Sequence, residues 1–99
     1  VDHEIGHTVD FELTKILQKN GIYTGKRASY EILKRTAKAL GMGYSECKRA
    51  VSRYGNSEYG EWFAECYAEA MTSKSPRPVA VECMRQIDKM LEEHGVKHG

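Results

Sequence analysis

Two histidines and a glutamate at the start of the chain have the types and spacing of a metal site. His3, Glu4 and His7 form the pattern H-E-x-x-H. On a helix, side chains four residues apart lie on one face, with Cβ atoms about 5–6 Å apart. Two imidazoles at this spacing can bind one zinc ion, and the glutamate between them can act as general base. The pattern predicts hydrolytic zinc chemistry, and the alternative is a pair of surface or core histidines.

A catalytic zinc site needs a third protein ligand and keeps its fourth position open for water. Asp10 continues the stripe of His3 and His7 but comes from the same helix. Because reaching the metal from there would strain the geometry, we expect Asp10 to hold His7 in place instead. His94 and His98 lie close to the end of the chain, and we expect them to be surface residues.

A stripe of glutamates further along the chain is the best source of the third ligand. Its members, at spacings of three, four and four residues, are Glu58, Glu61, Glu65 and Glu69. The alternative interpretation is a solvated acidic face. Trp62 and Phe63 are interleaved with the stripe, which indicates that part of this helix is buried. Carboxylates that enter a core need a cation to offset desolvation. Zn²⁺ is the cofactor we expect to supply it, although other divalent ions can occupy such sites.

The elements that must position these residues are helices. Apolar periodicity predicts five helices, over residues 2–19, 29–40, 45–54, 57–71 and 79–94. The expected N-caps are Ser29, Ser45 and Ser57. No strand pattern and no repeat is evident. We therefore expect a mainly α fold with a single domain over residues 1–99.

The helical pattern also predicts which side chains form the core. We expect Phe11, Leu13 and Trp62 to join the first and fourth helices. The apolar face expected for the last helix consists of Val81, Met84, Ile87 and Leu91. All four methionines, which are Met42, Met71, Met84 and Met90, are expected to fill gaps in the core.

Composition describes an ordinary soluble domain. Of the 99 residues, 40% are hydrophobic and 29% are charged, with a formal net charge of +1. No apolar run approaches the ~20 residues of a membrane span, so we expect no membrane partner. Cys47, Cys66 and Cys83 are odd in number and lie in helical segments. We expect buried free thiols, a reducing compartment and hence a cytoplasmic location.

A basic central segment supports an alternative from another functional class. Between Lys26 and Arg53 there are eight Lys/Arg and two Asp/Glu residues. The same segment has the order helix, short glycine-containing turn, helix, which is typical of helix-turn-helix domains. Nucleic-acid binding is therefore an alternative. We favour it less, because the whole chain is nearly neutral and these helices also serve as the spacer between His7 and Glu61.

The two motif blocks together resemble a known enzyme family. Residues 1–10 and 54–65 are similar to the gluzincin catalytic domain typified by anthrax lethal factor and its relatives in phages and mobile elements. That family pairs an H-E-x-G-H-x-x-D helix with a later helix of the form Y-G-x-x-x-x-x-E-x-F-A-E. Both halves occur here in that order. The conjunction carries the resemblance, because either half alone is less specific.

The resemblance implies a role for each matching residue. His3 and His7 match the first two zinc ligands and Glu61 matches the third, with Glu65 or Glu58 as the fallback. Glu4 matches the general base, and Tyr54 matches a tyrosine that hydrogen-bonds the oxyanion. The residues that match carboxylates around the ligands are Asp10 and Glu65. The implied substrate is a polypeptide.

The resemblance also shows what the sequence lacks. Family domains place a small mixed sheet before the H-E-x-x-H helix, and the substrate pairs with its edge as an added strand. No residues precede His3 that could form this sheet. We therefore expect the helical, metal-binding, C-terminal part of a zincin-like fold from a larger parent protein, with weak or no peptidase activity alone. A degenerate zinc-binding interaction module of a phage or mobile-element protein is the alternative.

Overall fold

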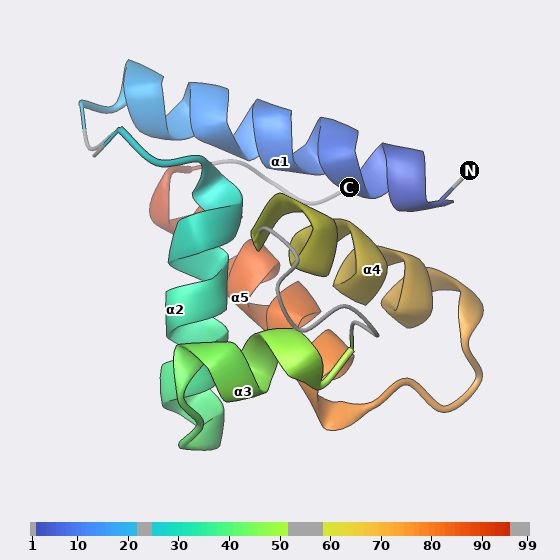
Figure 1. Cartoon of the computed structure of the whole chain (residues 1–99). Helices are drawn as coiled ribbons and strands as arrows, with labels where there is room; N and C mark the ends of the chain where they lie inside the picture. The colour runs from blue at the N-terminus through green and yellow to red at the C-terminus, as the bar shows by residue number, and fades with distance from the viewer. Residues whose placement is uncertain (1, 22–24, 52–58, 96–99) are drawn as a thin grey trace.

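Five helices make up the fold, in a computed structural model that describes residues 2–21, 25–51 and 59–95 (Figure 1). The side chains of Asp2 and His3 are also outside the description. The helices are α1 (Asp2–Lys19), α2 (Ala28–Leu40), α3 (Tyr44–Arg49), α4 (Tyr59–Thr72) and α5 (Pro78–Glu93). The described residues contain no strand. The prediction of a mainly α chain with about five helices is confirmed.

Helix α4 lies at the centre of the packing. Its buried side chains are those of Trp62, Phe63, Ala64 and Cys66, which point to more than one side of the helix. A helix that is apolar on more than one side must be covered on more than one side. Accordingly, α4 contacts α1, α2 and α5. Burying a large apolar side chain contributes about 1.5–3 kcal/mol, so Trp62 and Phe63 anchor the core.

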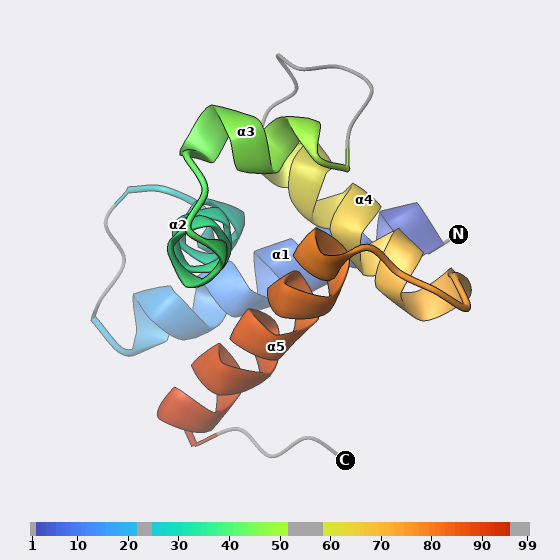
Figure 2. The same cartoon turned by 90° about the horizontal axis from the view of Figure 1, so that it is seen from below.

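Helix α1 packs across α4: the two helices run in opposite directions in Figure 1 and cross obliquely in Figure 2. Besides Thr14, its buried residues are Gly6, Asp10, Leu13 and Leu17. Their spacing of four, three and four residues places them on one face. Leu13 and Trp62 both belong to the core cluster, as expected. This face brings the N-terminal histidine helix onto the helix with the glutamate stripe.

The N-cap residues of α2 and α3 are not the predicted serines. Ser29 is the second residue of α2, whose N-cap is Arg27. Ser45 is the second residue of α3, whose N-cap is Gly43. Both cap predictions were wrong. Side chains of α1 supply the acceptors at the start of α2, and at α3 the Gly43 N–H donates to Oε1 of Glu46 at 3.4 Å. Helix α3 also ends at Arg49, five residues earlier than predicted. The third expected cap, Ser57, lies outside the described residues.

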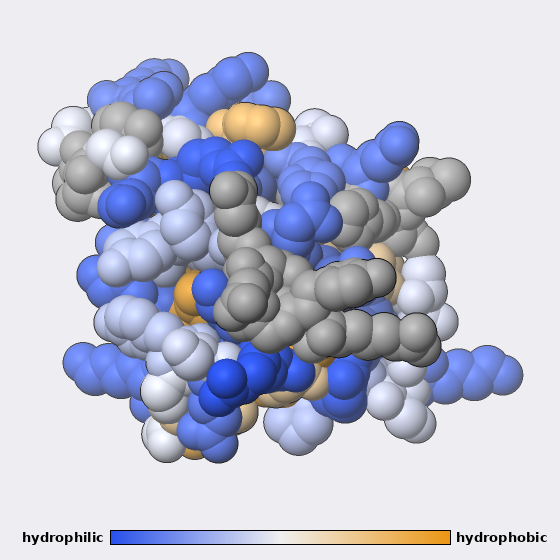
Figure 3. Space-filling view, in the orientation of Figure 1, coloured by the Kyte–Doolittle hydropathy of each residue, from blue (hydrophilic) through white to orange (hydrophobic). Residues whose placement is uncertain are grey.

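Three predicted core residues lie on the surface. Phe11, Met71 and Val81 are each about half exposed, at 51%, 50% and 51%. None of the three belongs to the core cluster, and the Phe11 ring faces the Arg27 guanidinium instead, with 5.6 Å between Cζ and the ring centre. Met90 and Ile87 are buried as expected. Elsewhere the face seen in Figure 3 is mainly hydrophilic, and its hydrophobic atoms form small separate patches.

The three cysteines are buried and free, as predicted. They come from α3, α4 and α5, so the thiols join the core of the helix bundle. Among the described residues, no helix combines the length and apolar character that crossing a bilayer would require.

Candidate metal centre

The structure brings together two predicted metal ligands from helices far apart in the sequence. His7 on α1 and Glu61 on α4 face each other, with 3.1 Å between Nε2 and Oε1. The His7 side chain is 28% exposed and the Glu61 side chain 52% exposed. The pair therefore lies at the rim of the α1–α4 interface, where solvent and a metal ion can reach both groups.

The distance between these two atoms suits a shared zinc ion. In a tetrahedral site, a nitrogen at about 2.0–2.1 Å and an oxygen at about 2.0–2.2 Å from zinc lie roughly 3.3–3.5 Å apart. The observed 3.1 Å differs from this by a few tenths of an ångström. Small side-chain rotations would therefore convert the direct contact into coordination of one ion. The donor types, imidazole and carboxylate, are also those that zinc uses.

A glycine makes this contact possible. A Cβ added at Gly6 would lie 2.8 Å from the Cα of Ala64 and 3.2 Å from its carbonyl oxygen. Both atoms belong to the α4 backbone, which cannot give way easily. The missing side chain lets α1 and α4 approach closely one residue before His7. The glycine inside the histidine motif therefore has a packing role that spacing arguments alone did not reveal.

Other predicted site residues are placed only in part. His3 lies in α1 four residues before His7, but its side chain is outside the description. Tyr54 and Glu58 fall within residues 52–58, which are not described. Glu4 is on α1 and exposed to solvent. Within the described side chains, no group of three or more His, Cys, Asp or Glu residues could hold a metal ion.

Asp10 is fully buried, and its carboxylate points toward the start of α2. Its Oδ1 accepts a hydrogen bond of 2.8 Å from the backbone N–H of Ser29. The Thr14 hydroxyl similarly accepts a 2.9 Å hydrogen bond from the backbone N–H of Ala28. Two α1 side chains thus satisfy N–H groups that a helix start leaves unpaired. The expected role of Asp10 in holding His7 stays a prediction.

Arg27 is a residue near the site that the sequence argument missed. Its Nε lies 3.8 Å from Oδ2 of the buried Asp10. The available signal was Asp10 itself, because a carboxylate on the buried face of a helix needs a positive partner. We assigned that need to the glutamates of the fourth helix instead.

Most described glutamates of the stripe do not enter the core, contrary to our expectation. Glu61 and Glu65 are exposed, so neither needs a cation to remain charged. The Glu69 side chain is 17% exposed, and its cation is Arg77 rather than zinc. The stripe is a solvent-facing edge of α4 whose last member is paired with another protein side chain.

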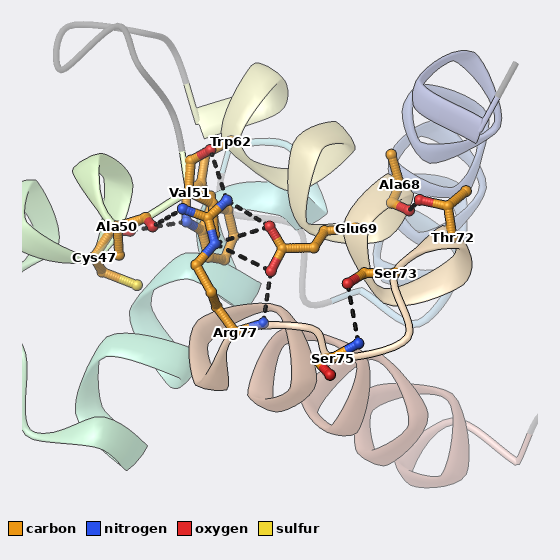
Figure 4. Close-up of polar contacts among 10 residues, drawn as sticks. All are labelled: Cys47, Ala50, Val51, Trp62, Ala68, Glu69, Thr72, Ser73, Ser75 and Arg77. Carbon is orange, nitrogen blue, oxygen red and sulfur yellow. Dashed lines mark hydrogen bonds and ion pairs between the residues drawn. The ribbon is translucent and has the colours of Figure 1, made fainter.

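Arg77 binds Glu69 through several hydrogen bonds (Figure 4). Its Nε donates to Oε1 and Oε2 at 2.9 and 3.1 Å, its Nη2 also donates to Oε1, and its backbone N–H donates to Oε2 at 2.6 Å. Its Nη1 donates to the carbonyl of Ala50 at 2.7 Å, and its Nη2 to that of Val51 at 3.4 Å. The Arg77 guanidinium lowers the pKa of Glu69 mainly through the side-chain hydrogen bonds. This cluster joins α4, the α3 end and the start of α5.

The buried thiols do not form a nucleophilic site. Burial raises the pKa of Cys47 to about 12, and burial together with a hydrogen bond to Cys83 also raises the pKa of Cys66. Thiolates are the reactive form of cysteine. At neutral pH Cys47 and Cys66 are therefore protonated core residues.

The central basic segment forms the expected helix, turn and helix, over α2 and α3. Helix α3 has six residues, and its Cys47 is buried in the core. Two of the basic side chains on α2 have acidic neighbours, with Lys34 at 3.5 Å from Glu31 and Arg35 at 3.0 Å from Glu93. Nucleic-acid binding by this segment stays an untested alternative.

Comparison with known proteins found no relative of this chain. The chain matches no family model, no curated protein and no solved structure. The resemblance to gluzincins accordingly depends on the motif residues, and the geometric argument for a metal site depends on the contact between His7 and Glu61.

Proposed function

We propose that the chain holds a zinc ion at a gluzincin-type site and that the site hydrolyses peptide bonds. The observation that carries the proposal is the 3.1 Å approach of His7 Nε2 to Glu61 Oε1 across two helices. A chance pairing of surface residues would not require a backbone approach as close as that of Gly6 to Ala64. His3, one helical turn before His7, supplies the third ligand.

Each residue then has a chemical role. Bound zinc would lower the pKa of a water molecule to about 7 and polarise the peptide carbonyl. Glu4 accepts the proton of the attacking water and returns it to the leaving amine. Its exposed position on α1 leaves the carboxylate accessible to solvent and substrate. Tyr54 donates a hydrogen bond to the oxyanion, an interaction whose loss typically costs about 10²–10³ in turnover.

Metal analysis of the purified chain tests the metal site. Wild type should bind one equivalent of Zn²⁺, and His3→Ala, His7→Ala and Glu61→Gln should each lose it. Glu4→Gln should keep the metal, because Glu4 is not a ligand. Equal metal content in wild type and the three ligand variants would remove the basis of the proposal.

Peptide cleavage tests the second half of the proposal. With a library of unstructured peptides and Zn²⁺ present, wild type should release fragments at a low rate, as expected above for this chain alone, and Glu4→Gln should release none. Zinc binding without any cleavage would instead favour the interaction-module alternative. Binding to nucleic acid that weakens steeply with added salt would favour the helix-turn-helix alternative, because phosphate contacts release counterions.

A further inference from the structure

Arg27 precedes α2 and contacts side chains of both α1 and α4. It is the residue directly before α2, and its side chain is 32% exposed. Its Cζ atom lies 5.6 Å from the ring centre of Phe11 on α1 and 5.9 Å from that of Tyr59 on α4. A guanidinium within about 6 Å of an aromatic ring is attracted to it. Arg27 therefore contacts both helices that carry the proposed ligands.

Arg27 contacts α1 through the buried carboxylate of Asp10. The side chain of Asp10 is 0% exposed, and its Oδ2 has no hydrogen-bond partner among the described residues. The Arg27 Nε is 3.8 Å from this oxygen. A buried carboxylate without a positive neighbour is costly, so the guanidinium is held beside Asp10.

The attachment of Arg27 to α4 depends on a glycine. A Cβ added at Gly60 would lie 2.6 Å from Nη2 and 3.2 Å from Cζ of Arg27. The guanidinium therefore lies directly against the α4 backbone, in space that any other residue would fill. The three atoms nearest to this added Cβ all belong to Arg27.

These contacts flank the proposed ligands in sequence. Asp10 follows His7 by three residues on α1, and Gly60 directly precedes Glu61 on α4. On the other side of the pair, Gly6 lies against Ala64. The separation of the two helices at His7 and Glu61 is thus bounded by a backbone contact on one side and by the Arg27 guanidinium on the other.

We propose that Arg27 is a positioning residue for the metal site, because its guanidinium holds α1 and α4 at the separation that places His7 beside Glu61. This inference rests on the proposed zinc site. Metal–ligand distances tolerate changes of only about 0.2 Å, so a small change in helix separation weakens coordination. Arg27 acts on the ligands through Asp10 and Gly60, and it needs no contact with the metal.

Zn²⁺ titration in competition with a chromophoric chelator tests this role. Arg27→Gln should raise the Kd for Zn²⁺ about tenfold, within the range of roughly 10–100-fold that outer partners of metal sites typically show. Arg35→Gln is the matched control. The Arg35 side chain is also 32% exposed and pairs with a carboxylate, Glu93 at 3.0 Å, away from α1 and α4. It should leave the Kd within twofold of wild type.

A second variant keeps Arg27 and moves only its guanidinium. In Gly60→Ala, the new methyl group displaces the flexible end of Arg27 rather than any backbone, so the helices should still fold. Its Kd for Zn²⁺ should rise as in Arg27→Gln. In the double variant the two effects should not add, because both substitutions remove the same contact.

Co²⁺ absorption gives a readout that loss of stability alone would not move. In the two variants, fully loaded with Co²⁺, the visible bands should shift from those of wild type, because the ligand geometry has changed. Unchanged Kd and unchanged bands in both Arg27→Gln and Gly60→Ala would overturn the inference while leaving the zinc site intact. Failure of wild type to bind Zn²⁺ would overturn the proposed function and this inference together. If Arg27→Gln does not fold, Gly60→Ala decides alone.

Discussion

Two glutamates on α4, two helical turns apart, have opposite surroundings. Glu69 is 17% exposed and receives hydrogen bonds from the Arg77 side chain and backbone. Glu61 is 52% exposed and faces His7 at 3.1 Å. Arginine is permanently charged and cannot coordinate a metal, whereas histidine is a common metal ligand. At one end of α4, Glu69 and Arg77 form a structural clamp. At the other end, Glu61 lies beside a histidine that can bind a metal.

The comparison shows what distinguishes a candidate site from a stabilising ion pair. A carboxylate whose oxygens are already occupied by guanidinium and backbone donors has little capacity for a ligand. A half-exposed carboxylate beside an imidazole instead places an oxygen donor next to a nitrogen donor, and zinc binds both donor types. Acidic residues at helical spacing therefore carry little information until their partners are known, because the Arg77 donors come from the α4–α5 connection and not from the stripe itself.

The largest expected effect is a difference in Zn²⁺ affinity between variants of the two glutamates. Glu61→Gln should weaken Zn²⁺ binding by at least about 100-fold, because even residues outside the ligand set cost roughly 10–100-fold when replaced. Glu69→Gln, on the same helix, should leave the Kd within twofold of wild type. Competition titration of both proteins measures the difference. Equal losses in the two variants would mean that the two ends of α4 do not differ as proposed.

The second effect is on the free energy of unfolding and concerns the Glu69 end of α4. Arg77→Ala should lower the free energy of unfolding by about 2 kcal/mol, because it removes charged hydrogen bonds to Glu69 and leaves the Ala50 carbonyl without this donor. The half-exposed position of Arg77 keeps the value below that of a buried pair. Urea unfolding measures the change.

Arg85→Ala is the control for the Arg77 variant. Arg85 lies on α5 and contacts Glu82 at 3.4 Å, with a side chain that is 64% exposed. The Glu82 side chain is 13% exposed, similar to Glu69, but a single ion pair three residues apart on a helix contributes only about 0.2–0.5 kcal/mol. If Arg85→Ala destabilises the chain as much as Arg77→Ala, the Glu69 cluster is not a specific clamp.

The third effect concerns the helix contact beside His7. Gly6→Ala should destabilise the chain by about 1–2 kcal/mol, since the new Cβ would lie 2.8 Å from the Ala64 Cα and the backbones must separate. The gain in helix propensity, roughly 0.5–1 kcal/mol, offsets part of the cost. Zn²⁺ affinity should fall as well, because His7 moves away from Glu61. Gly60→Ala should cost less stability, as its Cβ meets a flexible side chain. The reverse order of the two costs would contradict the close approach at Gly6.

Much of the helical framework was predictable from local patterns. The α1 range matches its expected limits, and Gly41, which ends α2 with a φ of 67°, marks a stop that the sequence shows directly. The pairing of the first and fourth helices followed from Leu13 and Trp62, which are both buried. Amphipathic periodicity determines these features, and it is a property of short sequence windows.

The features that escaped prediction depend on tertiary partners. The start of α2 is capped by Asp10 and Thr14 of α1 rather than by Ser29, and no local pattern reveals an acceptor that comes from another helix. The pairing of Glu69 with Arg77 requires the turn between α4 and α5 to fold back. For the metal site, the motif predicted that His7 and Glu61 would meet, but Gly6 and Arg27 became visible only when the helices were packed.

The smallest effect is the pH dependence of the clamp at the Glu69 end of α4. The Arg77 hydrogen bonds hold the pKa of Glu69 below its usual value of 4.5, so Glu69 stabilises the fold at pH values above 4.5. This contribution is lost as the pH falls through the lowered pKa, because protonation removes the charge that Arg77 binds. The stability difference between wild type and Glu69→Gln should therefore be largest near pH 7 and shrink below pH 4.5. Unfolding curves of wild type and Glu69→Gln at pH 7, 5 and 3 measure the difference, and a wild-type advantage that persists at pH 3 would contradict a charge-dependent clamp.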